Sequence, residues 1–395
     1  GEAAATNGAG EEVGDGAAGD DNKRRSRWDR CGGPMRRFFL SPYWKTATFL
    51  VVAFVPVFGV LVVLPRILDH MKIDTLLIRC AHYAFGSYIS VLFLYNFYQS
   101  QVTNPGRTTG VKPSSEVSGQ FQLVFEDGET MENSKYKQIG SQDPLMYAQN
   151  YCMHCQHWKP PRAHHCSACK LCTLRMDHHC PFTGNCIGLN NHGHFALMYM
   201  FAVIGLTYAL YMCCFGVFHC QMNAIDAGLV RRRPLRDLKG VYVILRTSFW
   251  QLFKYTDRLL LAETLAVVFA FAAVLSMGTV TLHHVARGRT TLEMNFPMKE
   301  YVQIKTGVYC PLGDGFYDLG WKQNFRDILG PSWLKRLFLP IKGAPLDPHV
   351  AVAPRPSAVG VDALLERIKE VEAEGVKAPP TTHEALGITT VPGGA

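Results

Sequence analysis

Long apolar runs without charged residues dominate the middle of the chain. The first, TATFLVVAFVPVFGVLVVLP, lies between Lys45 and Arg66. Four such runs occupy residues 46–65, 80–99, 194–218 and 264–282. A helix needs roughly 20 apolar residues to cross about 30 Å of hydrocarbon. Four uncharged runs of this length are rare in a soluble protein, so the pattern predicts an all-α polytopic membrane protein with four transmembrane helices.

The distribution of basic residues predicts how these helices are oriented. The segment before the first run contains KRRSRWDR and MRRFF, which favours a cytosolic amino terminus by the positive-inside rule. Four crossings then place the carboxy terminus and the long loop 103–193 in the cytosol as well. The loop 219–258 contains RRRPLRDLK and opposes this orientation. We give the amino-terminal segment more weight, because charges in later loops often do not set orientation.

Composition and local pattern divide the chain into six predicted segments. The net charge of +8 suits contact with anionic lipid or phosphate, and no motif predicts a nucleic-acid partner. A strand candidate, FQLVFED, lies within the third segment, and the spacing of Val361, Leu364, Leu365, Ile368 and Val371 favours a surface helix within the last. The segments are a disordered, basic cytosolic amino terminus (1–44), transmembrane helices 1 and 2 (45–106), a cytosolic loop with a cysteine-rich domain at about 150–192 (107–193), transmembrane helices 3 and 4 (194–286), a cytosolic juxtamembrane segment (287–340) and a largely disordered tail (341–395).

Seven of the thirteen cysteines crowd into the stretch from Cys152 to Cys186. In a reducing cytosol this is not a disulfide framework. C-x-x-C spacing recurs three times in the stretch, and two thiolates at this spacing can bind one zinc ion, which prefers four S or N ligands. Two closed sites need eight ligands. Seven cysteines with one histidine would suffice, as would six cysteines with two histidines, which would leave one cysteine free.

The run MDHHCPFTGNC places an acid, two histidines and a cysteine in four consecutive positions. A nucleophilic thiol needs a lowered pKa, a base within hydrogen-bond reach and a group that orients the base. Cys180, His178 and Asp177 are residue types that can fill these three roles. A purely structural zinc finger has no use for this acid, so the run favours catalysis.

The Asp177-His178-His179-Cys180 run, with the preceding Cys/His spacing, resembles the DHHC family of protein S-acyltransferases (palmitoyltransferases). The similarity extends over about residues 45–330. It includes NPG from Asn104, the TTxE motif at Thr290, Thr291 and Glu293, and an aromatic-containing motif around Asn324. Three positions depart from the family pattern. The family usually has Asp at Asn104, Trp at Phe182 and Asn at Gly184.

The resemblance implies a fold and a set of site residues. The fold is four transmembrane helices with a cytosolic cysteine-rich domain of short β-hairpins between helices 2 and 3, holding two structural Zn²⁺ ions. Cys180 would be the nucleophile, His178 its base, Asp177 the orienting carboxylate and Thr291 a neighbour of that carboxylate. Side chains expected near bound acyl-CoA are Arg162, Lys170, Arg175 and Phe182. The implied zinc ligands are Cys152, Cys155, His165 and Cys172 for one ion, and Cys166, Cys169, His179 and Cys186 for the other.

The implied activity is a two-step transfer of a long-chain acyl group, such as palmitoyl, from acyl-CoA through Cys180 to cysteines of membrane-associated substrate proteins. The expected location is the endomembrane system (Golgi, ER or plasma membrane), with the lipid bilayer as a partner and both termini cytosolic. The sequence does not identify protein substrates, chain-length preference or an accessory subunit. The main alternative is a catalytically silent zinc-containing membrane adaptor. A zinc transporter would want more His, Asp or Glu inside the apolar runs.

Overall fold

The computed structural model describes residues 41–108, 151–229, 253–295, 301–343 and 357–374, apart from positions 153, 161, 306, 307, 312 and 314. Three features expected from the sequence lie outside the described residues: the amino-terminal segment up to residue 40, the strand candidate at 121–127 and the RRRPLRDLK segment at 231–239.

The first apolar run forms one span of three consecutive helical pieces. These are α3 (Pro42–Phe58), the π-helical turn η1 (Gly59–Val63) and α4 (Leu64–His70). Ser41 caps the start, because its hydroxyl accepts a hydrogen bond from the Trp44 N–H at 3.2 Å. Pro56 lies inside α3 and has no N–H to donate to the helix ladder, and the π-helical turn begins three residues later at Gly59.

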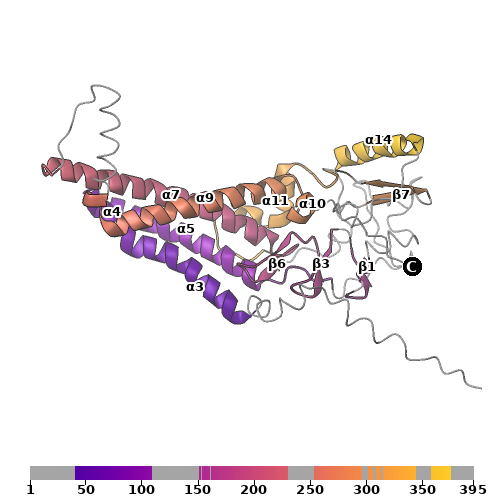
Figure 1. Cartoon of the computed structure of the whole chain (residues 1–395), viewed down its shortest axis with the longest axis horizontal. Coiled ribbons are helices and arrows are strands. Elements are labelled where there is room, and N and C mark those ends of the chain that lie inside the picture. Colours follow the sequence, from indigo (N-terminus) through magenta and orange to yellow (C-terminus); the bar gives the residue numbers. More distant parts are fainter. Residues whose placement is uncertain are drawn as a thin grey trace, which may run out of the picture.

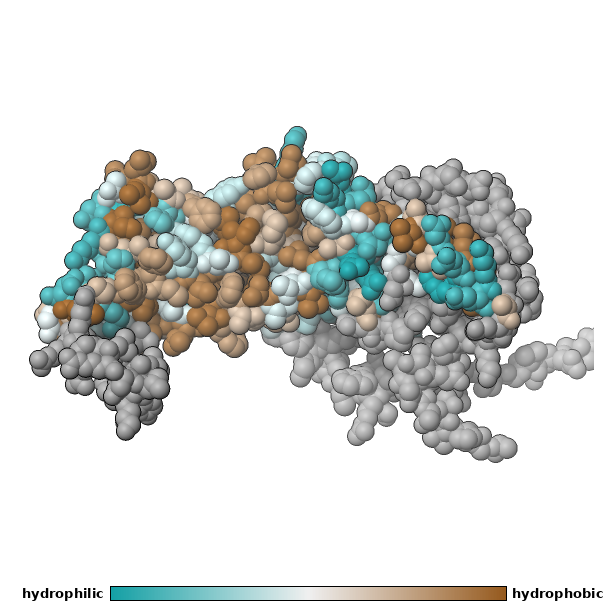
Figure 2. Space-filling view, turned by 90° about the horizontal axis from the view of Figure 1, so that it is seen from above, coloured by the Kyte–Doolittle hydropathy of each residue, from teal (hydrophilic) through white to brown (hydrophobic). Residues whose placement is uncertain are grey.

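Three further long helices are α5 (Leu76–Val102), α7 (His192–Asp226) and α9 (Arg258–Ala286). Within the described ranges, four helices are long and apolar enough to cross a membrane, which confirms the prediction. Each extends past its apolar run, because helical hydrogen bonding continues into the polar residues that flank the hydrocarbon. The space-filling view shows brown, apolar surface over much of these helices (Figure 2).

The four spans lie side by side, and the cysteine-rich strands gather at one end of them (Figure 1). Helix α7 packs against both α5 and α9, and α3 packs against α5. Fully buried Leu68, Met212 and Leu260 join the first, third and fourth spans in one apolar core.

Three short antiparallel hairpins make up the cysteine-rich region, as expected. The strand pairs are β1 (Tyr151–Cys152) with β2 (His157–Trp158), β3 (His164–Cys166) with β4 (Leu171–Thr173), and β5 (His178–Cys180) with β6 (Asn185–Ile187). Turns of this kind require positive φ angles, and Gln156, Lys170 and Gly184 supply them at 53°, 58° and 60°. Gly184 therefore suits its position, although the family usually has Asn there.

Beyond α9 the chain folds back beside the cysteine-rich region. The elements are α10 (Thr291–Asn295), β7 (Tyr301–Lys305), β8 (Val308–Pro311), α11 (Trp321–Leu329), α12 (Trp333–Arg336) and α14 (Ala358–Glu374). At Gly193, the first turn of α7 passes so close to the Ile328 carbonyl of α11 that a Cβ atom would collide with it.

Helix α14 lies where the apolar spacing within the tail predicts a helix. Residues 358–374 form a helix that packs against β8, and Leu364 and Ile368 on its inner face are buried. The helical spacing of the apolar residues was the correct signal. The surface that covers the helix comes from distant residues, which the local spacing does not reveal.

Candidate active site

The β5–β6 hairpin places the candidate metal ligands on one face and the candidate nucleophile and base on the other. Successive side chains of a strand point to opposite sides. His179 and Cys186 are directly opposite each other in the register, so they share one face. His178 and Cys180 flank His179 on the same strand and therefore project to the other face. This alternation keeps the candidate nucleophile and base apart from the metal-binding pair.

Two groups of four ligand side chains come together beside the hairpins. We call them the first and second clusters, and within each the ligand atoms all lie within 4.8 Å of one another. In each cluster a C-x-x-C turn of one hairpin meets a cross-strand His/Cys pair of the next hairpin. The first cluster is Cys152, Cys155, His165 and Cys172, and the second is Cys166, Cys169, His179 and Cys186.

The spacing of these atoms fits zinc. His165 Nδ1 lies 3.3–3.8 Å from the three sulfur atoms of the first cluster. His179 Nδ1 lies 3.5–3.7 Å from those of the second. A tetrahedral zinc ion with bonds of about 2.3 Å to sulfur and about 2.0 Å to nitrogen places neighbouring S and N ligands about 3.6 Å apart. The described chain thus offers two closed sites of three thiolates and one imidazole.

Cys180 is the one cysteine between Cys152 and Cys186, a stretch whose cysteines are all described, that belongs to neither cluster. Its side chain is buried and packs with Phe97, Ile187 and Phe195 near the beginning of α7. The thiol therefore stands where the cysteine-rich region meets the membrane-spanning helices.

His178 lies between Cys180 and a buried carboxylate. Its Nδ1 atom is 2.6 Å from Asp177 Oδ2, and its ring packs edge-on against Phe195 at 5.1 Å. Thr291 holds the same carboxylate from α10. Its N–H donates to Asp177 Oδ1 at 2.7 Å and its hydroxyl to Oδ2 at 3.0 Å. Residues 114 positions apart thus fix one carboxylate.

The electrostatics of these three groups favour a thiolate–imidazolium pair. Burial acts against every charged form here, but the hydrogen bonds to Asp177 and Cys180 outweigh it and raise the pKa of His178 to about 9. Burial likewise raises the pKa of the Cys180 thiol, but the hydrogen bond and charge of His178 bring the net pKa below its ordinary value. For Asp177, His192 together with the hydrogen bonds from His178 and Thr291 overcomes burial, and the pKa lies well below its usual range.

Arg162 makes an ion pair with Glu293, and its contact with CoA phosphates stays a prediction that this geometry does not support. It is buried, and its Nε and Nη2 atoms donate to the two carboxylate oxygens of Glu293 at 2.6 and 2.9 Å. Nη2 also donates to the Gly288 carbonyl at 2.7 Å, and the guanidinium stacks 4.5 Å from the Tyr317 ring centre. Arg162 therefore joins the cysteine-rich region to the segment that carries Thr291.

The other three side chains expected near acyl-CoA lie in different surroundings. Burial lowers the pKa of Arg175 to about 10, and its Nε atom is enclosed by protein, so this arginine is also poorly placed for a soluble phosphate. Lys170 is exposed on the turn between β3 and β4, and its contact with CoA stays a prediction. Phe182 is 62% exposed and lies at the edge of an apolar cavity that also reaches Cys180.

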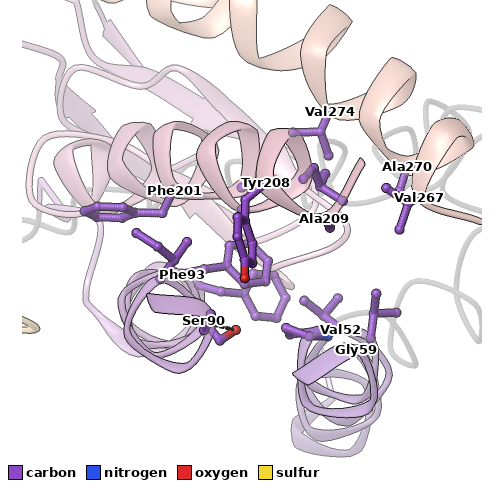
Figure 3. Close-up of a pocket in the computed structure, with 18 of the residues that line it drawn as sticks. Val52, Gly59, Ser90, Phe93, Phe201, Tyr208, Ala209, Val267, Ala270 and Val274 are labelled. Atoms are coloured by element: carbon purple, nitrogen blue, oxygen red, sulfur yellow. Dashed lines mark hydrogen bonds between the residues drawn. The ribbon is translucent and has the colours of Figure 1, made fainter. Parts of the chain in front are cut away.

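This cavity has a volume of about 450 Å³ and is lined by all four spans. Figure 3 shows Tyr208 projecting from α7 into the space between α5 and the first span, with Val267, Ala270 and Val274 of α9 on the far side. On α7 the lining extends from Phe195 to Cys213, which is about 27 Å at the helical rise of about 1.5 Å per residue. The cavity is long, narrow and almost wholly apolar, which suits a hydrocarbon chain.

Comparison with known proteins agrees with this geometry. The family model described as DHHC palmitoyltransferase matches residues 146–296. Residues 146–296 are therefore similar to the DHHC palmitoyltransferase domain. The match covers both clusters, Cys180, α7, α9 and Thr291, and it confirms the resemblance seen in the sequence.

The curated relatives that match are named as palmitoyltransferases or as a probable protein S-acyltransferase. Palmitoyltransferase PFA3 of Debaryomyces hansenii is 32% identical over 206 residues, covering 46% of this chain and 42% of that protein. The human palmitoyltransferase ZDHHC15 is 26% identical over 279 residues, covering 66% of this chain and 68% of that protein. A probable protein S-acyltransferase 13 of Arabidopsis thaliana is 33% identical over 128 residues, covering 31% of this chain and 38% of that protein. The chain spans about half the length of the fungal and plant relatives that it matches.

Sequence reasoning missed one residue close to the DHHC site. His192, at the start of α7, is buried, and its Nε2 atom lies 3.9 Å from Asp177 Oδ1. The only available signal was its place between the cysteine-rich region and the third apolar run, which does not specify a partner.

Proposed function

We propose that this chain is a zinc-containing membrane enzyme that transfers a long-chain acyl group from acyl-CoA to protein cysteines. One observation carries the proposal. Cys180 lies outside both metal clusters, beside the His178–Asp177 pair, and it lines the same apolar cavity that extends among the four spans. A silent adaptor has no need for a thiol with a lowered pKa at the mouth of such a cavity.

In the first step, the Cys180 thiolate attacks the thioester carbon of acyl-CoA. A bond forms between Cys180 Sγ and the acyl carbon, and the bond from that carbon to the CoA sulfur breaks. The departing CoA thiolate takes the proton held by His178. Asp177 keeps the imidazole oriented and stabilises its charged form, and Thr291 fixes Asp177 in turn.

In the second step, His178 accepts the proton of an incoming cysteine thiol on a substrate protein. That thiolate attacks the acyl carbon, the bond to Cys180 Sγ breaks, and the Cys180 thiolate is restored. Throughout both steps the cavity holds the acyl chain while the CoA head or the protein thiol approaches from the aqueous side. The transfer is therefore a ping-pong reaction.

The two clusters are proposed to hold structural Zn²⁺. Bound zinc would cross-link the three hairpins and contribute directly to their folding, as it does in other small metal-stabilised domains. The second cluster bears on catalysis because His179 lies between His178 and Cys180 on β5. The alternation of side chains along β5 directs His179 into the second cluster and Cys180 away from it.

We also place the site in the cytosol and the protein in the endomembrane system. The hairpins, α10, α11 and α14 all lie at one end of the spans (Figure 1). The basic segment KRRSRWDR precedes α3, which begins at that same end, and positive charge favours the cytosolic side.

The function is tested by measuring whether the acyl group is transferred from the enzyme to the cysteine of a substrate. The purified protein in vesicles is supplied with labelled palmitoyl-CoA and a membrane-tethered peptide that bears one cysteine. Label on the peptide thiol, absent from a serine version of the peptide, is the expected result. Release of free fatty acid without labelled peptide would identify a thioesterase instead, and absence of any covalent label would favour the adaptor.

The Thr291→Val variant is expected to slow acyl-enzyme formation about tenfold. It loses the hydroxyl that donates to Asp177 Oδ2 but keeps the backbone N–H bond to Oδ1. A hydrogen bond to a charged group contributes roughly 1.5 kcal/mol, which corresponds to about a tenfold change in rate. Single-turnover labelling measures the effect. Thr279→Val, at an exposed hydroxyl of α9, serves as the control, and equal rates in both variants would argue against the role of Thr291.

The Ala209→Phe variant is expected to shift the preferred donor toward shorter acyl chains. Ala209 lines the cavity well inside the membrane-spanning part of α7, and a phenyl ring there would block the deeper half. Competition between acyl-CoA donors of different length, read by intact-protein mass, gives the preference. Ile204→Phe places the same phenyl ring on an exposed face of the same helix and should leave the preference unchanged. An unaltered profile in Ala209→Phe would mean that the chain lies elsewhere.

A further inference from the structure

Arg107 lies just beyond α5, outside the cysteine-rich region, yet its side chain reaches the second cluster. Its Nη1 atom donates to the Thr173 hydroxyl at 2.9 Å and approaches Cys186 Sγ at 3.8 Å. The backbone of Arg107 also forms an isolated antiparallel bridge with Thr173, so the residue is held against β4 from both its main chain and its side chain. This is a fixed contact of a half-buried arginine.

With zinc bound, the second cluster would carry a net negative charge that a nearby cation could compensate. Three thiolates and one neutral imidazole around a divalent ion leave a net charge of −1. Cys186 is fully buried and Cys166 nearly so, and a buried net charge is costly unless a neighbour compensates it. A guanidinium that donates to the coordinating sulfur lowers that cost, and partners of this kind strengthen metal binding.

We propose that Arg107 is a positioning residue for the second cluster, where its guanidinium, oriented by Thr173, compensates the charge on Cys186 and secures the bound zinc. The proposal rests on the zinc assignment made above. It adds a functional link between the end of α5 and β6, because Cys186 pairs across the hairpin with His179, the neighbour of His178 and Cys180.

The turn at residues 104–106 positions Arg107 beside the second cluster. Gly106 precedes Arg107 with a φ of 93°, and its N–H donates to the Asn104 side chain at 3.0 Å. Leu174 N–H in turn donates to the Gly106 carbonyl at 2.8 Å. This hydrogen bond holds the turn at 104–106 beside the end of β4, the strand that contains Thr173. Arg107, the next residue, therefore lies close to the second cluster. Asn104 makes this turn as an aspartate could, which accounts for the departure from the family pattern.

The test measures zinc retention in the full-length protein in detergent, without reference to activity. Zinc per chain is determined first, and each variant is then titrated with a strong chelator. Arg107→Met keeps the aliphatic bulk and removes the charge. It is expected to lose one of two zinc ions at about tenfold lower chelator concentration, within the range for residues that hydrogen-bond metal ligands. Mass-mapped alkylation should rise at Cys169 and Cys186 and stay unchanged at Cys152 and Cys155.

Two further variants keep the result decisive if Arg107→Met folds poorly. Thr173→Val removes only the hydroxyl that orients the guanidinium, and Arg107→Lys keeps the charge. Both should weaken the second cluster less than Arg107→Met does, in the same direction. Arg79→Met removes a partly exposed arginine, paired with Asp69, at the other end of α5 and should match the wild type.

The proposal would be overturned if Arg107→Met, Arg107→Lys and Thr173→Val all retained zinc as the wild type does. It would also be overturned if both clusters lost zinc equally. A wild-type protein with fewer than two zinc ions would instead undo the zinc assignment itself, and the proposal with it. The two failures are distinguishable because the wild-type zinc content is measured before any variant.

Discussion

Replacement of Cys180 with serine is expected to abolish acyl-enzyme formation while both metal clusters stay filled. The hydroxyl of serine is a far weaker nucleophile than a thiolate, so labelling from acyl-CoA should fall at least about 1,000-fold. The side chains are nearly isosteric, and Cys180 is not among the eight cluster residues. Covalent labelling and zinc per chain are measured on the same sample.

Cys214→Ser is the matched control for this substitution. Cys214 is an exposed cysteine on α7, outside both clusters and outside the lining of the cavity. It should keep wild-type labelling and wild-type zinc. If Cys180→Ser lost a zinc ion, Cys180 would be a ligand and the assignment of the second cluster would be wrong.

Cys166→Ala should have the opposite signature, with one zinc ion lost and the cysteine-rich region destabilised. Cys166 is buried at the end of β3, where it joins a C-x-x-C turn to the His179–Cys186 pair of the next hairpin. Structural zinc contributes roughly 10 kcal/mol or more of apparent binding free energy to small domains, so loss of a ligand is severe. We expect a lower unfolding temperature and faster proteolysis between residues 151 and 192.

The control for this variant is Cys80→Ala, at an exposed position on α5. It removes a thiol without touching either cluster and should retain both zinc ions. Two zinc ions in Cys166→Ala would contradict the ligand assignment, whatever happened to activity.

The spans and the candidate nucleophile could be predicted from the sequence because their signals are local. Length without charge specifies a membrane helix, and the flanking polar residues shift only its ends. His178 and Cys180 lie two positions apart and share one face once β5 forms, and Asp177 is the sequence neighbour of His178. The assignment of ligands to each cluster came from the resemblance, because spacing left two counting schemes open.

The remainder of the site depends on contacts between distant segments. Arg162 and Glu293 are 131 positions apart, and no local pattern distinguishes an arginine committed to a buried carboxylate from one that faces water. The reach of Arg107 to Cys186 spans 79 positions and depends on the turn at 104–106. The cavity depends on side chains from four helices, and α14 depends on burial against β8.

The structure shows what surrounds Phe182, which stands where the family usually has tryptophan. Phe182 is exposed at the cavity edge, and the Trp44 indole donates to the carbonyl of the adjacent Pro181 at 2.7 Å. An indole N–H is thus present beside this turn from α3, and an aromatic ring still closes the cavity beside Cys180. The departure therefore leaves the proposed chemistry intact.

The most direct test of the account is the covalent state of the wild-type protein after incubation with palmitoyl-CoA. Intact-protein mass is recorded before and after hydroxylamine, which cleaves thioesters, and the adduct is mapped by peptide analysis. The account predicts one hydroxylamine-labile palmitoyl group on Cys180. An unmodified protein that still holds two zinc ions, or an adduct on another cysteine, would contradict it.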